Sequence, residues 1–261
     1  MKVTAALREY VETPDRFAEV PAGASVRRFA DERMCILEGP TWASISGVRV
    51  GEGEVEALLA DVRHRVAADK EPVWWIGPNA RPHDLHERLQ ELGLREPRDR
   101  ATLVYGLALT EAPDAPPEGV DVSPIETFEQ FVAGRELQWE AFDTPEDRRA
   151  KNRLRLREDF EESQRFQVPV GFLATLGGRP AGTALAVPSE RGVFLIGGAT
   201  AAWARGRGLY RALVRARWDY AVARGTPALV THAVPDTSYP ILRRLGFQDV
   251  CKIRRLEDSR G

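Results

Sequence analysis

The distribution of apolar residues divides the chain into two stretches with regular apolar patterns. A segment with few apolar residues lies between them. Thr110–Val120, TEAPDAPPEGV, is rich in proline and acidic residues and has few apolar side chains. Segments of this composition connect regular elements and do not contribute to a core. We therefore expect a linker over residues 111–120, an N-terminal domain over residues 1–110 and a C-terminal domain over residues 121–261.

Strand-like and helix-like patterns alternate in the N-terminal stretch. Short apolar runs bounded by glycine or polar residues predict strands, and apolar residues three and four apart predict helices. The expected strands are residues 34–39, 42–50, 73–77 and 101–109, and the expected helices are Val55–Ala68 and Pro82–Leu92.

The C-terminal stretch has a helical part, then consecutive strands, then alternation. Two of the strands meet at GGRP, residues 177–180, which is typical of a tight turn. Alternation of strands with helices favours an α/β or α+β fold, with a mixed central sheet flanked by helices. The predicted helices are Phe128–Phe142, Pro145–Gln164, Leu209–Ala223 and Pro240–Leu245, and the predicted strands are residues 121–125, 168–176, 181–188, 192–200, 228–234 and 247–257.

One unit of pattern occurs in both stretches. VWWIGPNARPHDLHERLQELGL, residues 73–94, and ALVTHAVPDTSYPILRRLGF, residues 228–247, both read as a strand, a loop with proline, a short helix, Leu-Gly and a large apolar residue. This similarity predicts an internal duplication. The alternative is a common supersecondary unit in which Gly93 and Gly246 simply end helices.

Composition and charge narrow the class of protein. The 261 residues are 43% hydrophobic and 29% charged, and 37 basic side chains nearly balance 39 acidic ones. This composition predicts a folded globular protein without a general affinity for nucleic acid or anionic membranes. No apolar run has the length of about 20 residues that a membrane span needs. The two cysteines are far apart and no leader-like start is visible, so we expect a cytoplasmic protein of undetermined oligomeric state.

The most informative segment is TAAWARGRGLYRAL, residues 200–213. It places two glycines between arginines at the start of a predicted helix that follows a strand. The first N–H groups of a helix have no internal partner, and the helix dipole favours an anion there. Gly206 and Gly208 would let a phosphate approach the backbone, and Arg205, Arg207 and Arg211 would supply donors. The segment predicts a pyrophosphate site; the alternatives are a basic, solvated turn and an RG-type contact with nucleic acid.

Comparison with known phosphate-binding motifs shows which kind of phosphate site this segment resembles. A P-loop needs Gly-Lys-Ser/Thr, which is absent, and the dinucleotide fingerprint needs a third glycine where Arg211 stands. The remaining match is R-x-x-G-x-[G/A] over Arg205–Tyr210, with Tyr210 in place of the usual small residue. At this motif, and in the strand, helix and strand that follow it, the chain resembles the GNAT superfamily of N-acetyltransferases.

The resemblance implies an acyl-CoA-binding fold, with acetyl-CoA as the co-substrate and an amine as the acceptor. It assigns the pyrophosphate to Arg205, Gly206, Arg207, Gly208, Leu209 and Tyr210, and the pantetheine to the backbone near Ala199 and Thr200. The helices between Pro124 and Gln164 would form the acceptor side. The N-terminal half resembles a degenerate repeat without cofactor, since its Gly-x-Gly at Gly51 and Gly53 is followed by glutamates where a phosphate would bind.

The residues for proton transfer are less clear. In the family resembled here, a tyrosine four residues before the Gly-Phe pair usually protonates the thiolate, but this chain has Leu242 there, and Pro235 replaces a frequent asparagine. Tyr239 and then His232 are the nearest substitutes as catalytic acid, and Glu140 is a candidate base. Each has a structural alternative. Tyr239 would only form part of the wall of the site, His232 would be a hydrogen-bonded histidine within a strand, and Glu140 would be a solvated carboxylate.

Two functions remain open at this point. The first is an N-acetyltransferase in which the amine of a small molecule or protein attacks acetyl-CoA directly in a ternary complex. The second is a noncatalytic acyl-CoA-binding sensor or interaction module, which the missing tyrosine keeps open. No metal site is expected, because His83 and His86 have an H-x-x-H spacing without further ligands in reach.

Overall fold

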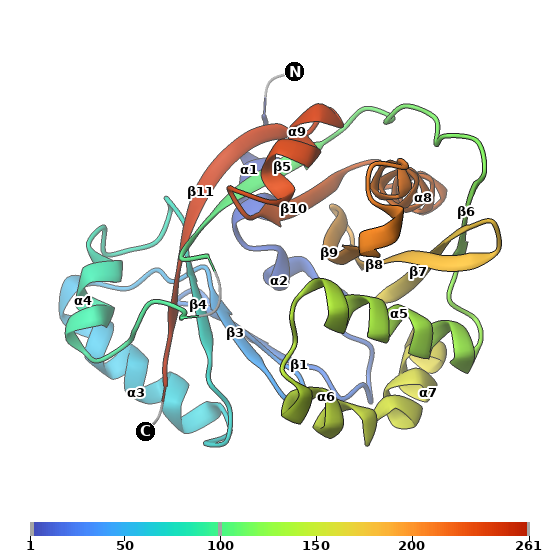
Figure 1. The fold of residues 1–261 in the computed structure, drawn as a ribbon. Coiled ribbons are helices and arrows are strands. Elements are labelled where there is room, and N and C mark those ends of the chain that lie inside the picture. Colours follow the sequence, from blue (N-terminus) through green and yellow to red (C-terminus); the bar gives the residue numbers. More distant parts are fainter. Residues whose placement is uncertain (1–2, 99–100, 260–261) are drawn as a thin grey trace. The chain divides into compact units, whose positions relative to one another are not determined.

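The computed structural model describes residues 3–98 and 101–259 (Figure 1). Its contacts separate two compact units. Unit 1 contains residues 1–108 and 232–261, and unit 2 contains residues 109–231. Each unit has helices packed on its own strands, which in the described part of the chain all belong to one mixed 11-stranded sheet, and each is described by itself.

The unit boundaries differ from the expected domain boundaries at the C-terminus. The first division, between Ala108 and Leu109, falls at the start of the expected linker. The second falls between Thr231 and His232, so the last 30 residues pack with the N-terminal half and not with residues 121–231. The physical reason is strand pairing: Gln248–Glu257 (β11) lies between Val73–Ile76 (β4) and Leu103–Leu109 (β5), antiparallel to both.

The sheet of unit 1 continues from β4 through three further strands. Ala43–Ser46 (β3) is parallel to β4, whereas Cys35–Glu38 (β2) and Arg27–Ala30 (β1) follow in antiparallel order. The parallel pair is joined through the 3₁₀ turn Glu52–Glu54 (η1) and the helix Val55–Arg65 (α3). The other helices of this unit are Ala5–Glu12 (α1), Pro14–Phe17 (α2), Leu85–Glu91 (α4) and Ser238–Arg244 (α9).

Alternation along β3 separates the two faces of this sheet. Ile45 is fully buried in an apolar core with Trp74 of β4, Leu58 of α3 and Leu85 of α4. Its neighbour Ser44 points to the other face, where its hydroxyl donates to Asp15 of α2 at 2.5 Å. Side chains of a strand alternate between faces, so α3 and α4 cover one side of the sheet and α2 covers the other.

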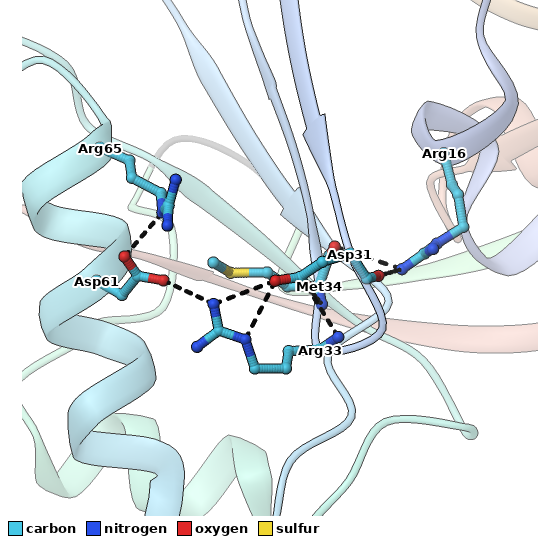
Figure 2. Close-up of polar contacts among 6 residues, drawn as sticks. All are labelled: Arg16, Asp31, Arg33, Met34, Asp61 and Arg65. Atoms are coloured by element: carbon cyan, nitrogen blue, oxygen red, sulfur yellow. Dashed lines mark hydrogen bonds and ion pairs between the residues drawn. The ribbon is translucent and has the colours of Figure 1, made fainter.

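A charged network ties the β1–β2 turn to the helices of unit 1 (Figure 2). One carboxylate oxygen of Asp31 accepts the backbone N–H groups of Arg33 (2.9 Å) and Met34 (3.0 Å), and the other accepts the guanidinium of Arg33. Arg33 also pairs with Asp61 of α3 at 3.0 Å, and Asp61 pairs with Arg65. The turn is thereby fixed by side-chain acceptors and not only by strand pairing.

Unit 2 is built on a meander of antiparallel strands. Val120–Pro124 (β6), Val170–Leu176 (β7), Arg179–Ser189 (β8) and Gly192–Thr200 (β9) pair in sequence order. Leu229–Ala233 (β10) is parallel to β9 over Leu229–Thr231 and is reached through Leu209–Ala223 (α8). The helices Phe128–Ala141 (α5), Glu146–Arg153 (α6) and Leu156–Phe166 (α7) lie between β6 and β7 in the chain.

Helices α5 and α8 lie on opposite faces of this sheet (Figure 1). A Cβ on Gly182 of β8 would lie 3.3 Å from Leu213 of α8. The next residue, Thr183, is 3.0 Å from the Cβ position of Gly134 on α5. Successive strand residues point to opposite faces, so β8 is covered by α8 on one side and by α5 on the other.

Most predicted elements are present, and the differences have local causes. The helix predicted over Pro145–Gln164 is interrupted at Leu154 and Arg155, without the proline or glycine that would signal a break. The strand predicted over residues 42–50 ends at Ser46, because Gly47 takes a positive φ of 64°. Helices α1 and α2 and strand β1 were not predicted, whereas the GGRP turn forms as expected with positive φ at Gly177 and Gly178.

Candidate functional site

Strand β9 carries a bulge three residues before its end. Ile196 pairs with Leu185 of β8 and Ala199 pairs with Thr183, so two residues of β9 stand opposite one of β8. The two residues are Gly197 and Gly198, and Gly197 has a φ of +61°. A bulge of this kind leaves one residue unpaired and bends the strand. Gly197 and Gly198 therefore form a defined break in the β8–β9 ladder.

The segment after β9 leaves its backbone donors free. Ala202–Ala204 (η2) forms a 3₁₀ turn, Gly206 and Gly208 have φ of +76° and +78°, and Gly208 is the N-cap of α8. Among the described residues, the N–H groups of Gly206, Arg207 and Gly208 donate to no backbone carbonyl, and no side chain caps the helix. A helix start in this condition presents N–H groups and partial positive charge to an anion.

The approach to this helix start differs between its two glycines. Around Gly206 there is open space within 4 Å of a Cβ position. At Gly208 the Cβ position is 2.5 Å from Cγ of Pro117, a residue of the predicted linker. Arg205, Arg207 and Arg211 are exposed beside the loop. A phosphate could therefore approach at Gly206, with three guanidinium groups nearby. At Gly208, the missing side chain leaves the space that Pro117 of the linker occupies.

Tyr210 turns its side chain toward the sheet and not toward the open side of the loop. Its ring lies 3.0 Å, and its hydroxyl 3.4 Å, from the Cβ position of Gly198 in the bulge. The guanidinium of Arg217 is near enough to interact electrostatically with the Tyr210 phenol. Burial raises the pKa of Tyr210, although Arg217 opposes that effect. The large residue at the motif's usual small position is thus part of the packing between α8 and β9.

Arg217 is a buried cation without a carboxylate partner among the described residues. Its side chain is 1% exposed, its Nε donates to Leu213 O at 3.0 Å, and one Nη donates to Leu185 O at 3.3 Å. Burial lowers the pKa of this guanidinium to about 10, so the group stays charged at pH 7. Its other Nη has no acceptor in the described part of the chain.

The residues assigned to pantetheine lie at the end of β9. Ala199 is buried and pairs with Thr183, and Thr200 pairs with Gly182 on the α8 face. The Thr200 hydroxyl oxygen is buried and has no hydrogen-bond partner among the described residues. An orphaned polar atom at this place can take a partner from a bound molecule.

On the other face of the sheet, α5 contacts the bulge through a glutamine. Gln138 is 7% exposed, and its amide nitrogen donates to Gly197 O at 3.0 Å. Glu140, the predicted base, is exposed two positions further along the helix. Two positions correspond to about 200° around a helix. Glu140 therefore does not share the face of α5 that meets β9.

The remaining predicted catalytic residues lie in unit 1. The Nε2–H of His232 donates to Val11 O at 2.7 Å, and its ring packs on Trp75. Burial lowers the pKa of His232 to about 4, so the imidazole is neutral at pH 7. Its Nε2 lone pair is not available while this bond exists. These features match the alternative of a structural histidine within a strand.

Tyr239 and Leu242 lie one turn apart on α9. The Tyr239 ring stacks on Tyr105 with centroids 4.4 Å apart, and its hydroxyl donates to Asp249 at 3.3 Å. Burial and this carboxylate raise the pKa of Tyr239. Leu242, at the usual tyrosine position, is 1% exposed and belongs to the core of unit 1.

In the N-terminal half, the loop at Gly51–Glu54 has a carboxylate of its own beside its backbone donor. The backbone N–H of Gly51 donates to the carboxylate of Glu54 at 2.6 Å. Glu52 lies 3.7 Å from Arg88 of α4. A protein carboxylate thus occupies the anion position at the start of η1 and α3, as the glutamates in the sequence predicted.

Other kinds of site are not indicated in residues 3–98 and 101–259. No group of three or more His, Cys, Asp or Glu side chains there could hold a metal ion, and His86 is instead buried beside Glu87. None of the described helices combines the length and apolar character needed to cross a bilayer.

Sequence reasoning did not identify Gln138 or Arg217 as part of this site. Gln138 has no distinctive signal in the sequence. It lies between Glu136 and Glu140, which are the more obvious candidates for a catalytic base. Arg217 is one of several arginines in α8, and only its position on the apolar stripe with Leu213 could have indicated burial.

Comparison with known proteins addresses the fold. No protein-family model matches the sequence, and no significantly similar curated protein was found. Among solved structures, a GCN5-related N-acetyltransferase from Kribbella flavida is 20% identical, with 91% of each chain covered and a TM-score of 0.64. A second GCN5-related N-acetyltransferase, from Sphaerobacter thermophilus, is 17% identical, with 97% of this chain and 84% of that one covered and a TM-score of 0.54.

A tandem GNAT protein from the clavulanic acid biosynthesis pathway is also similar. It is 15% identical, with 99% of this chain and 89% of that one covered and a TM-score of 0.57. The match over nearly the whole chain supports the predicted duplication, and the three structures together confirm the predicted fold class. The chain therefore has the fold of these GCN5-related N-acetyltransferases.

Proposed function

We propose that the chain binds acetyl-CoA through the loop Arg205–Tyr210 and transfers the acetyl group to a primary amine. The observation that carries this proposal is the uncapped start of α8, with free N–H groups at Gly206, Arg207 and Gly208 and open space at Gly206. Backbone donors and guanidinium groups in this arrangement suit a pyrophosphate. The GNAT fold supports the choice of acetyl-CoA over other pyrophosphates.

The residues at the end of β9 fit the rest of such a ligand. We assign the pantetheine to the backbone at Ala199 and Thr200, where the buried Thr200 hydroxyl lacks a partner among the described residues. Acetyl-CoA would supply an activated thioester. The chain's part is to hold the pyrophosphate at α8 and the pantetheine along β9.

Direct transfer is favoured over an acyl-enzyme. Burial raises the pKa of both Cys35 and Cys251 to about 12, so neither thiol is a ready nucleophile at pH 7. The amine nitrogen would attack the carbonyl carbon and lose a proton to water, the carbon–sulfur bond would break, and the leaving thiolate would take up a proton. Tyr239 remains our proposed proton donor. His232 is outside the proposed mechanism because its Nε2 is bonded to Val11 O, and Glu140 is outside it because it does not share the face of α5 that meets β9.

A noncatalytic acyl-CoA-binding function is the second candidate. It is favoured by Leu242, which is buried where the family resembled here usually has its acid, and by the low pKa of His232. A panel of amines assayed for thiol release from acetyl-CoA separates the two. Turnover with any amine supports the transferase, and binding without turnover across the panel supports the sensor.

The phosphate-loop assignment is tested by charge reversal. We expect Arg205→Glu with Arg207→Glu to weaken acetyl-CoA binding by about tenfold to a hundredfold in calorimetry, since each charge-assisted hydrogen bond is worth about 1.5 to 3 kcal/mol before screening at an exposed site. The matched control is Arg148→Glu with Lys151→Glu on α6, which changes the net charge equally on exposed side chains of the same unit. Equal affinity for both folded variants would refute the assignment.

A further inference from the structure

The bulge in β9 is held from both faces of the sheet of unit 2. On the α5 face, the Cβ position of Gly197 is 2.6 Å from the amide nitrogen of Gln138. On the α8 face, the Cβ position of Gly198 is 3.0 Å from the Tyr210 ring. Neither glycine could carry a side chain without displacing its neighbour. The two glycines therefore leave no room for a side chain on either face of the bulge.

Gln138 is the polar element of this support. Its amide nitrogen donates to Gly197 O at 3.0 Å, and its amide oxygen accepts from Arg135 at 3.3 Å. The second contact fixes which end of the amide faces the strand. Because a trans peptide directs its C=O and the following N–H to opposite sides, the bond that holds Gly197 O toward α5 directs the Gly198 N–H away from α5.

Packing alone does not account for a glutamine here. The side chain is 7% exposed on a helix face that also buries Gly134 and Leu137. Burying an amide is costly unless it is hydrogen-bonded, and the net gain of such a bond is small. An apolar side chain of similar size would fill the same space. The specific consequence of the glutamine is the orientation of the Gly197–Gly198 peptide.

We propose that Gln138 is a positioning residue, which fixes the bulge so that the Gly198 N–H can polarise the thioester carbonyl of bound acetyl-CoA. The inference rests on the proposed function. A preorganised backbone donor aimed at a carbonyl oxygen stabilises the charge that develops there during acyl transfer. Gln138 itself does not touch the reacting atoms; it acts through the peptide that it holds.

The test uses Gln138→Met, which keeps the length of the side chain and removes its donor, with Gln138→Leu as a second variant. The matched control is Gln164→Met on α7, because the Gln164 amide also donates to a backbone carbonyl, that of Ile125, at 3.0 Å. Circular dichroism establishes that each variant is folded, and calorimetry measures acetyl-CoA binding. The decisive readout is the carbonyl stretch of acetyl-CoA labelled with carbon-13 at the acetyl carbonyl, measured by difference infrared spectroscopy.

In the wild-type protein, we expect the bound carbonyl to absorb at lower frequency than free acetyl-CoA. In the folded Gln138 variant, the frequency should return toward the free value while affinity is retained, and Gln164→Met should behave as wild type. A full downshift in a Gln138 variant that binds acetyl-CoA would overturn the inference and leave the proposed function intact. Failure of the wild-type protein to bind acetyl-CoA would refute the proposed function, and the inference with it.

Discussion

The Asp31 network of unit 1 allows a stability prediction whose magnitude follows from its contacts (Figure 2). In Asp31→Asn, the side-chain oxygen can still accept the N–H groups of Arg33 and Met34, but the charge and the Arg33 pair are lost. A bond to a charged acceptor is worth about 1 kcal/mol more than a neutral one, and an exposed ion pair about 0.2 to 1 kcal/mol. With the carboxylate 29% exposed, we expect a loss of about 1 to 2 kcal/mol in the free energy of unfolding at pH 7.

The pH dependence gives this prediction its sign. Burial alone would raise the pKa of Asp31, but the N–H groups of Met34 and Arg33 and the Arg33 guanidinium outweigh burial and hold the pKa below 3.8. A depressed carboxyl pKa stabilises the folded state above the unfolded-state pKa, and this contribution is lost as pH falls through the folded-state pKa. The difference between wild type and Asp31→Asn should therefore be full at pH 7 and vanish once the wild-type carboxyl is protonated.

Urea unfolding followed by circular dichroism at pH 7 and at about pH 2.5, below the ordinary range of carboxyl pKa values, measures this difference. Asp121→Asn is the control, because Asp121 is exposed on β6 of unit 2. We expect no measurable change in the control at either pH. A difference for Asp31→Asn that is equal at both pH values, or absent at pH 7, would refute the electrostatic account of this turn.

Two further predictions concern the ligand. One acetyl-CoA should bind per chain, because Glu54 already occupies the donor at Gly51 in the N-terminal half; a titration that saturates at two per chain would contradict this. If the chain is a transferase, Tyr239→Phe should lower kcat about tenfold or more without changing acetyl-CoA affinity. The wild-type pH–rate profile should then have a basic limb above pH 10, since the pKa of Tyr239 is raised, and this limb should be missing from the variant.

Local patterns were sufficient to predict most elements, because strands such as β9 and helices such as α8 have clear apolar periodicity and are bounded by glycine. Pairing over long distances could not be predicted in this way. The strand β11 reads as the end of the C-terminal half, yet it pairs with β4 and β5 of the N-terminal half. An apolar alternation specifies which face of a strand is buried, but not which of several compatible neighbours it joins.

The candidate site shows the same limit at the level of side chains. Glycine and arginine spacing was enough to predict a phosphate loop at Arg205–Gly208, because the motif is local and its chemistry requires bare backbone; its binding role stays a prediction. The direction of the Tyr210 side chain depends on the space that Gly198 leaves 12 residues earlier. The role of Gln138 depends on Gly197, which is 59 residues away in the chain. Such contacts arise only when α5 and α8 pack on the sheet, so they were not predictable from periodicity.

The two halves of the chain provide an internal comparison for the binding proposal. Both have a strand, a Gly-x-Gly segment and a helix start at corresponding places in the pattern. In the first half, the carboxylate of Glu54 accepts the N–H of Gly51, so a carboxylate of the protein already lies at that helix start. In the second half, the cap is a glycine without a side-chain acceptor, and the N–H groups of Gly206 and Gly208 donate to no described backbone carbonyl. A carboxylate cap stabilises a helix by about 1 kcal/mol, so a helix start that lacks one forgoes that stability and keeps its donors available. This difference favours a single anion site per chain, at the start of α8.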